Sequence, residues 1–458
     1  MTRTFFIFGG LFGTLAGAAG GLVVMALFTR FRRRARALGG DVVREIGSLQ
    51  GEAQEALGAL RLIKSHGRES AAASRLTRNV FALRRAQLAM IGTTAGSRAL
   101  LLVGGAVRNA LLACPVEDID IATDARPDDV MRLVRAAGLK AVPTGIDHGT
   151  ITVVSDTRGF EVTTFRHDLE TDGRHAVVAF SDDLAEDARR RDFTINALYA
   201  GRDGKVVDPV GGLPDLAARR LRFVGQAQAR IREDYLRILR FFRFLAWYGR
   251  DANPEAVAAC SALKDGLARI ARERIGAEMK KLLAASDPAP AMALMAETGV
   301  LARILPAATV DDLPALIAAE GPRPPSWRRR LACLADRNSA DLLRLSRDEA
   351  RAQQVLRGAL DAGWSLNEAG YRLGFEAATD CALIRAARGQ DLPQDWETRL
   401  AEAASARFPI SADDLMPRLR GPALGRGMRA AEAAWIATDF VMPAPALIDI
   451  ALLAGERS

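Results

Sequence analysis

The pattern of hydrophobic and polar positions first sets the N-terminal region apart. Residues 5–28 contain no charged side chain, and an apolar run of this length is long enough to span a bilayer. Five arginines follow between Arg30 and Arg36, whereas Arg3 alone precedes the run. The positive-inside rule then places the N-terminus outside the membrane and the rest of the chain in the cytoplasm. Residues 41–90 have the spacing of a long amphipathic helix.

From Ala99 onward, short apolar runs with the character of strands begin. ALLLVGG at 99–105 predicts a buried strand that ends in a glycine turn, with a helix after it. DIDIAT at 118–123, GTITVVS at 149–155 and FEVTTF at 160–165 predict further strands, and DDVMRLVRAAG at 128–138 predicts a helix. After about Leu221 helical spacing continues to the end of the chain. The pattern therefore predicts an α+β fold, in which a small mixed sheet with helices on one face precedes a long helical part.

Composition adds a preference for an anionic partner and removes two kinds of site. The net charge of +8 and the pI of about 9.7 suit nucleic acid or an anionic membrane, although an arginine-rich proteome would explain them equally well. The four cysteines are far apart and form no CxxC pair, which argues against a disulfide framework or a structural zinc site. All four histidines precede residue 176, so the C-terminal half has no histidine for a metal site.

The strongest chemical signal is VGGAVRNALLACPVEDIDIAT at 103–123. Gly104 and Gly105 close a strand before a helix, and the glycine amides and the helix N-terminus together offer a site for triphosphate oxygens. Asp118 and Asp120 alternate along the next strand and therefore point to the same face. Two carboxylates so close together need a cation, and two Mg²⁺ ions would satisfy them. A bare Asp-x-Asp is usually a surface strand, but this one follows a glycine turn and a helix.

In that context the segment resembles the nucleotidyltransferase signature of the polymerase β superfamily. Residues 99–305 resemble the class II CCA-adding tRNA nucleotidyltransferase and poly(A) polymerase family, and the residues beyond Pro306 resemble it faintly. The resemblance implies a polymerase β-like head at 97–225, a helical neck at 226–305 that recognises the base, and a helical body and tail at 306–458 that bind tRNA. It also implies CTP and ATP as substrates and Mg²⁺ as cofactor, and it indicates no protein partner.

The resemblance assigns roles to several residues of the head. Asp118 and Asp120 would hold the metal as catalytic residues, and Glu161 of FEVTTFR would complete the set, unless it is only a solvent-facing strand residue. RRDFTINALY at 190–199 resembles the family's second motif, in which Asp192 and Asn196 lie one helical turn apart and reach the ribose. Arg190 and Arg191 would offer planar forks to phosphate. The expected nucleotide contacts are Gly104, Gly105, Arg108, Arg191, Asp192, Asn196, Asp234, Arg237 and Arg240.

REDYLRILRFFRF at 232–244 predicts a helix that selects the base. Asp234 and Arg237 are three residues apart, so on a helix their side chains lie on one face. An arginine donor beside an aspartate acceptor matches cytosine and adenine and mismatches guanine and uracil at both groups. A simple ion pair that stabilises the helix remains the alternative. ARERIGAEMKKLL at 271–283 is expected to brace this helix through Arg274, Glu278 and Lys281.

Other segments leave alternatives open. Residues 51–88 resemble the cytoplasmic helix of an ABC-exporter transmembrane domain, but the chain has no GxxxxGK[ST] motif, so we interpret them as a membrane-proximal spacer. A membrane-tethered module attached through residues 5–28, a poly(A) polymerase and an inactive RNA-binding relative are the competing functions. Residues 166–185 predict a mobile polar loop. Arg328, Arg329 and Arg330 either contact tRNA phosphates or lie on a plain helix surface. Asn109 and Ala113 depart from the family's usual Asp and Gly.

Overall fold

The computed structural model describes residues 99–116, 118–155, 158–172, 175–201, 204–335 and 338–456, all within one compact unit of the chain. The predicted membrane span at 5–28 and the predicted amphipathic helix at 41–90 lie outside these residues. Among the described residues, no helix has the length and apolar character needed to cross a membrane.

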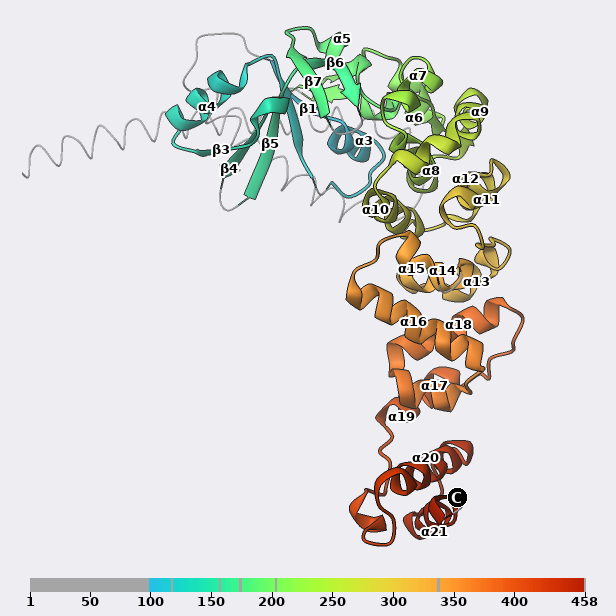
Figure 1. Ribbon diagram of the computed structural model, residues 1–458. Helices are drawn as coiled ribbons and strands as arrows, with labels where there is room; N and C mark the ends of the chain where they lie inside the picture. Colours follow the sequence, from blue (N-terminus) through green and yellow to red (C-terminus); the bar gives the residue numbers. More distant parts are fainter. Residues whose placement is uncertain are drawn as a thin grey trace, which may run out of the picture. The chain divides into compact units, whose positions relative to one another are not determined.

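The head is built on a seven-stranded mixed sheet, as predicted (Figure 1). In spatial order the strands are β3 (Lys140–Gly145), β4 (Thr150–Ser155), β5 (Arg158–Thr164), β2 (Asp120–Thr123), β1 (Leu100–Val103), β8 (Tyr199–Ala200) and β9 (Val206–Val207). Strands β2 and β5 are parallel, and the other neighbouring pairs are antiparallel. The sequence pattern missed β3, β8 and β9.

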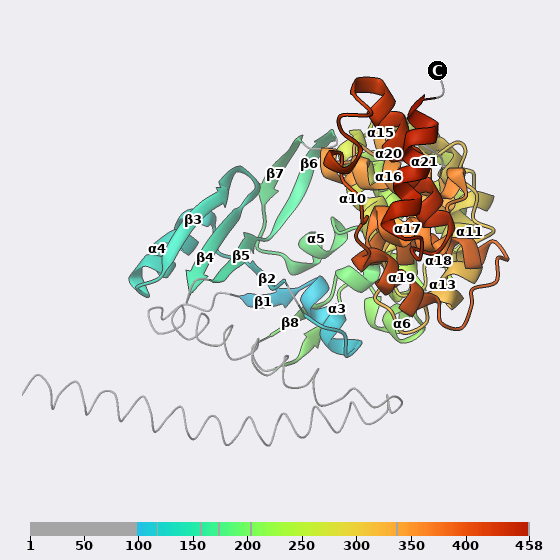
Figure 2. The ribbon, with the colours of Figure 1, turned by 90° about the horizontal axis from the view of Figure 1, so that it is seen from below.

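Helix α4 (Pro127–Ala136) covers one face of this sheet beside β3, β4 and β5 (Figures 1 and 2). Pro127 at its first turn presets the backbone angle, and Asp128 and Asp129 there suit the positive end of the helix dipole. Val130 and Val134 lie four residues apart on the buried side and pack with Ile121, Ile151 and Val162 of the sheet. This core fixes the strands that carry the carboxylates.

Residues 166–180, predicted as part of a mobile loop, form a β-hairpin of β6 (Arg166–Asp172) and β7 (His175–Phe180). The two strands were not predicted because the polar composition hid an antiparallel pairing that starts at Arg166 and Phe180; the mobility of the segment stays a prediction. The short helix α5 (Leu184–Arg189) follows beside β6 (Figure 2). Asp183 begins this helix by accepting a hydrogen bond from the Ala185 amide at 2.8 Å.

The head and the neck share one hydrophobic core. Phe193 packs against Phe223 with ring centres 4.8 Å apart and against Phe244 at 5.2 Å, and Phe223 stacks on Phe241 at 5.8 Å. Phe241 and Phe244 belong to helix α8 (Leu236–Tyr248). Contacts of this kind hold α8 firmly against the RRDFTINALY segment.

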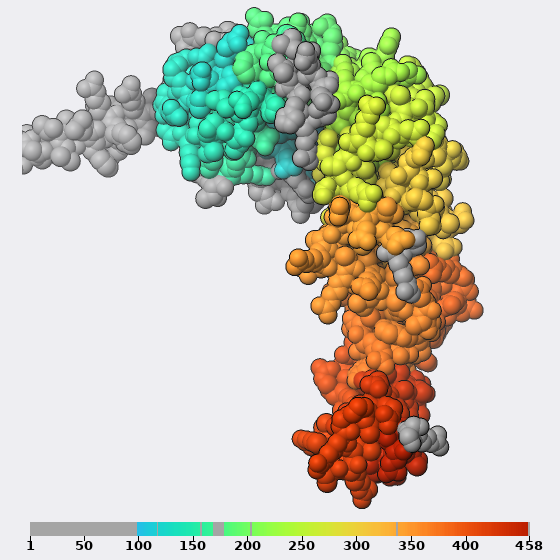
Figure 3. Space-filling view, viewed as in Figure 1, coloured from blue at the N-terminus to red at the C-terminus, as the bar shows by residue number. Residues whose placement is uncertain are grey.

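Helices make up nearly all of the described chain after Leu221; strand β11 (Asp251–Ala252), which pairs with β10 (Arg220–Leu221), is the exception there. The surfaces of neck and body adjoin where α10 (Arg272–Leu283) packs on α14 (Trp327–Leu334) (Figure 3). In chain order the neck contains α7 (Ala227–Glu233), α8, α9 (Pro254–Leu263), η4 (Lys264–Arg269), α10 (Arg272–Leu283), α11 (Ala289–Glu297) and α12 (Val300–Ile304). The body contains α13 (Leu313–Glu320), α14 (Trp327–Leu334), α15 (Ser339–Leu342), α16 (Arg347–Ala362), α17 (Leu366–Leu373), α18 (Phe375–Ala387) and α19 (Trp396–Ser405), and the tail contains α20 (Gly421–Ala437) and α21 (Ala444–Glu456).

Candidate active site

The turn between β1 and α3 (Gly105–Leu111) has the conformation that the two glycines predict. Gly104 has a φ of +68°, which favours glycine, and its amide donates to the Leu198 carbonyl at 3.1 Å. A Cβ atom on Gly104 would lie 3.4 Å from Nη1 of Arg191 and 3.6 Å from the carbonyl oxygen of Asn196. The turn therefore lies directly against the RRDFTINALY segment.

The predicted carboxylates share one face of the sheet beside this turn. Asp118 and Asp120 are exposed while Ile119 and Ile121 are buried, as the alternation predicts. Asp120 pairs in register with Val103 of β1 on one side and with Glu161 of β5 on the other. Directly paired residues of neighbouring strands project to the same face, so Glu161 lies on the face of Asp120.

These three side chains lie close enough for their charges to interact. Although Asp120 reaches the solvent, the protein around it partly desolvates its carboxyl and raises its pKa; the charges of Glu161 and Asp118 raise the pKa further, and the Arg191 charge opposes the rise. A carboxyl group with two like-charged neighbours is stabilised in its ionised form by a bound cation. Within the described residues, no group of three or more His, Cys, Asp or Glu side chains is placed to hold a metal ion by itself. Mg²⁺ binds through as few as one or two protein carboxylates, with waters and substrate phosphates as its other ligands, so Asp118 and Asp120 fit this ion.

Asp192 and Asn196 lie in the segment that packs between the sheet and α8. We predicted them one helical turn apart, but only a 3₁₀ turn, η3 (Thr194–Asn196), forms there, and Asp192 precedes it. They still meet, because Asn196 Nδ2 donates to Asp192 Oδ1 at 3.1 Å. Arg240 Nε of α8 donates to Asp192 Oδ2 at 2.8 Å. Burial alone would raise the pKa of Asp192, but Arg240 and Asn196 outweigh it and lower the pKa to about 2. This residue therefore joins head and neck as an anion.

Arg108 is buried, only 5% exposed, and binds protein groups. Its guanidinium donates to the Asn196 side chain and, through Nη2, to Asn109 Oδ1 at 2.8 Å. It also lies 3.9 Å from the ring centre of Tyr248 on α8. Asn109, which replaces the aspartate common in the family, is thus a partner of Arg108. A direct nucleotide contact by Arg108 stays a prediction.

The segment with Asp234 and Arg237 differs from the predicted continuous helix. Asp234 has φ −151° and ψ 107°, so α7 ends there and α8 begins after it. The prediction was wrong because the Asp234 side chain turns back onto the backbone and interrupts the helix: its carboxylate accepts from the Leu236 amide at 3.0 Å and from Arg274 Nη2 at 2.7 Å. Arg237 pairs with Glu233 and also donates to the Arg230 carbonyl at 2.9 Å. Asp234 and Arg237 therefore do not form the simple ion pair that was the alternative.

The bracing role expected for α10 is confirmed for two of its three residues. Arg274 holds Asp234, and Glu278 lies 2.9 Å from Arg243 of α8. Lys281 contributes through its carbonyl, which accepts from Trp247 Nε1 at 2.7 Å. Sequence reasoning missed Arg243, although the spacing of Arg237, Arg240 and Arg243 every three residues along α8 could have found it.

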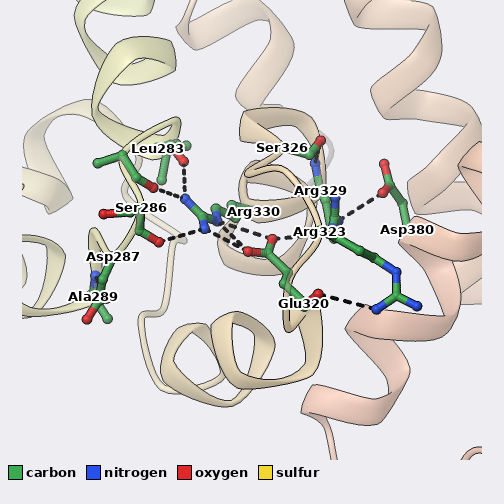
Figure 4. Close-up of polar contacts among 11 residues, drawn as sticks. Leu283, Ser286, Asp287, Ala289, Glu320, Arg323, Ser326, Arg329, Arg330 and Asp380 are labelled. Atoms are coloured by element: carbon green, nitrogen blue, oxygen red, sulfur yellow. Dashed lines mark hydrogen bonds and ion pairs between the residues drawn. The ribbon is translucent and has the colours of Figure 1, made fainter. Parts of the chain in front are cut away.

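The predicted arginine cluster at 328–330 is only partly at the surface. Arg328 is exposed, but Arg329 and Arg330 are buried and therefore do not contact phosphates. Arg330 binds Glu320 and carbonyl groups at the end of α10, and Arg329 binds Asp380 at 2.9 Å (Figure 4). The three consecutive arginines hid this difference, since helix periodicity places only some of them on the outer face.

Comparison with known proteins agrees with this architecture. The family model described as "Poly A polymerase head domain" matches residues 100–222, and the one described as "Probable RNA and SrmB-binding site of polymerase A" matches residues 252–311. The segments that these models match begin at residue 100 and give no support to the ABC-exporter resemblance of the N-terminal region.

Individual relatives extend the match over the chain. CCA tRNA nucleotidyltransferase 1, mitochondrial, of Danio rerio is 45% identical over 208 residues, which are 44% of this chain and 48% of that protein. The match thus spans about half the length of the mitochondrial relatives. The CCA-adding enzyme of Geobacillus stearothermophilus is 34% identical over 364 residues, which are 76% of this chain and 81% of that protein.

A solved structure shares both fold and sequence. The crystal structure of the Bacillus stearothermophilus CCA-adding enzyme in complex with CTP matches this chain with a TM-score of 0.63 and 30% identity, and the match covers 78% of this chain and 92% of that chain. The mixed-sheet head, the helical neck and the extent of the similarity lead to one conclusion. The chain belongs to the family of CCA-adding enzymes that carry a poly(A) polymerase head domain.

Proposed function

We propose that this protein adds C, C and A to the 3′ ends of tRNA from CTP and ATP without a nucleic-acid template. The observation that carries the proposal is the set of Asp118, Asp120 and Glu161 on one sheet face beside the Gly104 turn. The names of the relatives, which include CCA-adding enzymes and a structure with CTP, support the same activity.

In the proposed reaction the terminal tRNA 3′-hydroxyl attacks the α-phosphorus, and pyrophosphate leaves. Asp118 and Asp120, with Glu161 beside them, would hold Mg²⁺, which when bound activates the hydroxyl and neutralises charge on the leaving group. The Gly105 amide at the start of α3 offers a donor to the triphosphate, whereas the Gly104 amide is taken by the Leu198 carbonyl. Asp192 and Asn196 would contact the ribose in this proposal, and Arg240 and the hydrogen bond between the two side chains hold Asp192 in place.

Asp234 and Arg237 retain capacity to read a base after their protein contacts are made. The two oxygens of Asp234 accept one hydrogen bond each, and a carboxylate can accept about four. The hydrogen bonds that Arg237 makes within the described residues use Nη1, which leaves Nη2 and Nε. Arginine would donate to the ring nitrogen of cytosine or adenine, and Asp234 would accept from the exocyclic amine. Guanine and uracil present the opposite groups at these positions.

Several finer features belong to the same proposal. Exposed arginines of the body and tail, such as Arg328, Arg420, Arg426 and Arg429, are candidates for tRNA phosphates. Membrane attachment through residues 5–28 and the role of residues 1–96 stay predictions, and so do the domain boundaries at 225 and 305.

An incorporation assay tests the proposal. The full chain and a version that starts after Ala95 are incubated with tRNA lacking CCA and each nucleoside triphosphate in turn. We expect two C residues with CTP alone, one further A when ATP is added, and nothing with GTP or UTP. The absence of CTP incorporation would refute CCA addition, and a long A tail from ATP alone would favour the poly(A) alternative.

A further inference from the structure

A buried carboxylate without an assigned role lies behind the candidate site. Asp187 of α5 is about 1% exposed and accepts hydrogen bonds from three side chains. The donors are Arg190 Nε at 2.7 Å, Arg191 Nη2 at 3.0 Å and the Tyr199 hydroxyl at 2.6 Å. Burial opposes ionisation of Asp187, but Arg191 and Arg190 outweigh it, so its pKa lies below the ordinary value. Asp187 is therefore an anion fully engaged with protein groups.

Arg191 connects this anion to the site. Its Nε donates to the Tyr199 hydroxyl at 3.0 Å, and its Nε and Nη2 both face Asp187. Its remaining nitrogen, Nη1, makes no hydrogen bond within the described residues and lies where a Cβ atom on Gly104 would be 3.4 Å away. One edge of the guanidinium is thus held by protein while the other faces the glycine turn.

We propose that Asp187, with Tyr199, is a positioning pair that holds Arg191 so that its free edge meets the triphosphate at the Gly104 turn. This inference rests on the proposed function, because it requires a nucleotide at that turn. Arginine suits the task, since its planar fork binds phosphate oxygens while its other edge is fixed. Asp187 itself touches no substrate.

The carboxylate also keeps Arg191 from a competing partner. The charge of Arg191 acts on Asp120, so the two groups are close enough to attract each other. Without the negative charge at position 187, the arginine would turn toward the Asp118 and Asp120 carboxylates. It would then leave the phosphate position and occupy groups that the proposed reaction needs.

The test compares the binding of two nucleotides to the full-length protein. Asp187→Asn keeps the side-chain shape and removes the charge, and Tyr199→Phe removes one hydroxyl from the same network. Equilibrium dialysis with labelled CTP and labelled CMP separates contacts to the outer phosphates from contacts to the base and ribose. We expect the Kd for CTP to rise about tenfold in Asp187→Asn and less in Tyr199→Phe, with the Kd for CMP unchanged.

A matched control and a double variant separate positioning from stability. Asp380→Asn breaks a comparable Asp–Arg pair with Arg329 in the body and should leave both Kd values unchanged. Asp187→Asn added to Arg191→Gln should weaken CTP binding no further than Arg191→Gln alone. Equal weakening of CTP and CMP, or additive effects of the two changes, would overturn the inference. Wild-type protein that binds no CTP would instead remove the proposed function.

Discussion

Arg330→Met should strongly destabilise the joint between neck and body without changing the affinity for tRNA. Arg330 is about 1% exposed and donates to the carbonyl of Leu283 at 2.7 Å, to that of Ser286 at 3.1 Å and to that of Ala285 (Figure 4). It also binds Glu320, whose Oε2 lies 2.6 Å from Nη2. One side chain thus ties the end of α10 to α13 and α14.

The magnitude follows from the partners that the substitution leaves behind. A buried ion that loses its partner costs about 3–5 kcal/mol, and Arg329, 3.4 Å from Glu320, keeps this cost near the lower end. Each of the three abandoned carbonyls adds about 1 kcal/mol, so the total is about 6 kcal/mol. Glu320→Gln keeps the carbonyl bonds and an oxygen acceptor, and it should cost only about 2 kcal/mol.

Urea unfolding followed by tryptophan fluorescence measures both variants. With a slope of about 3 kcal/mol per molar urea, Arg330→Met should lower the midpoint by about 2 M and Glu320→Gln by less than about 1 M. Binding of tRNA by the folded protein should be unchanged in Arg330→Met and weaker in Arg328→Ala, whose side chain is exposed. An Arg330→Met protein of normal stability with weakened tRNA binding would show that Arg330 contacts tRNA and does not hold the joint.

Three further predictions concern the head and the neck. Because the pKa of Asp192 is lowered to about 2, its ionised form should contribute about 2 kcal/mol of stability above about pH 4, and this contribution should be lost as the pH falls toward 2. The difference in unfolding free energy between wild type and Asp192→Asn should shrink over that range. A constant difference would contradict this role of Asp192. Gly266→Ala should lower kcat/KM for CTP at least about tenfold, because the new Cβ would lie 1.9 Å from the ring of Tyr235 and displace the adjacent Asp234. Unchanged kinetics would show that the position of Asp234 does not depend on this packing. Glu161→Gln should lower the pKa of Asp120, because it removes a neighbouring negative charge, and should therefore shift the acidic limb of the pH–rate profile to lower pH. This shift should occur whether or not Glu161 binds metal. A loss of activity of about a hundredfold or more should occur only if Glu161 binds metal.

The sheet and its carboxylates could be predicted because their signals are local. Alternation along 118–123 places Asp118 and Asp120 on one face without knowledge of any distant residue, and the two glycines fix the turn before them. The mixed character of the sheet and the helical remainder also followed from the pattern, but the order of the strands did not.

Asp234 could not be placed correctly from the same information. A break of only two residues between α7 and α8 leaves the helical spacing of the flanking residues nearly intact, so periodicity does not show it. The break depends on Arg274, which lies 40 residues away in sequence.

Asp187 and Arg330 were missed or misassigned for a related reason. Asp187 belongs to the run SDDLAEDARRRD, in which nothing in the sequence separates a buried carboxylate from its exposed neighbours. Its burial comes from Tyr199 across the fold. Arg330 is buried by contacts with Leu283 and Glu320, which are set by tertiary packing.

If the carboxylates on the face of the head sheet drive nucleotide addition, the loss of Asp120 should abolish it. Labelled CTP and ATP are supplied with tRNA lacking CCA to the wild-type protein and to Asp120→Ala, after both have been shown to unfold at the same urea concentration. We expect complete CCA on the tRNA with wild-type protein and no added nucleotide with the variant. Undiminished CCA synthesis by folded Asp120→Ala would contradict it.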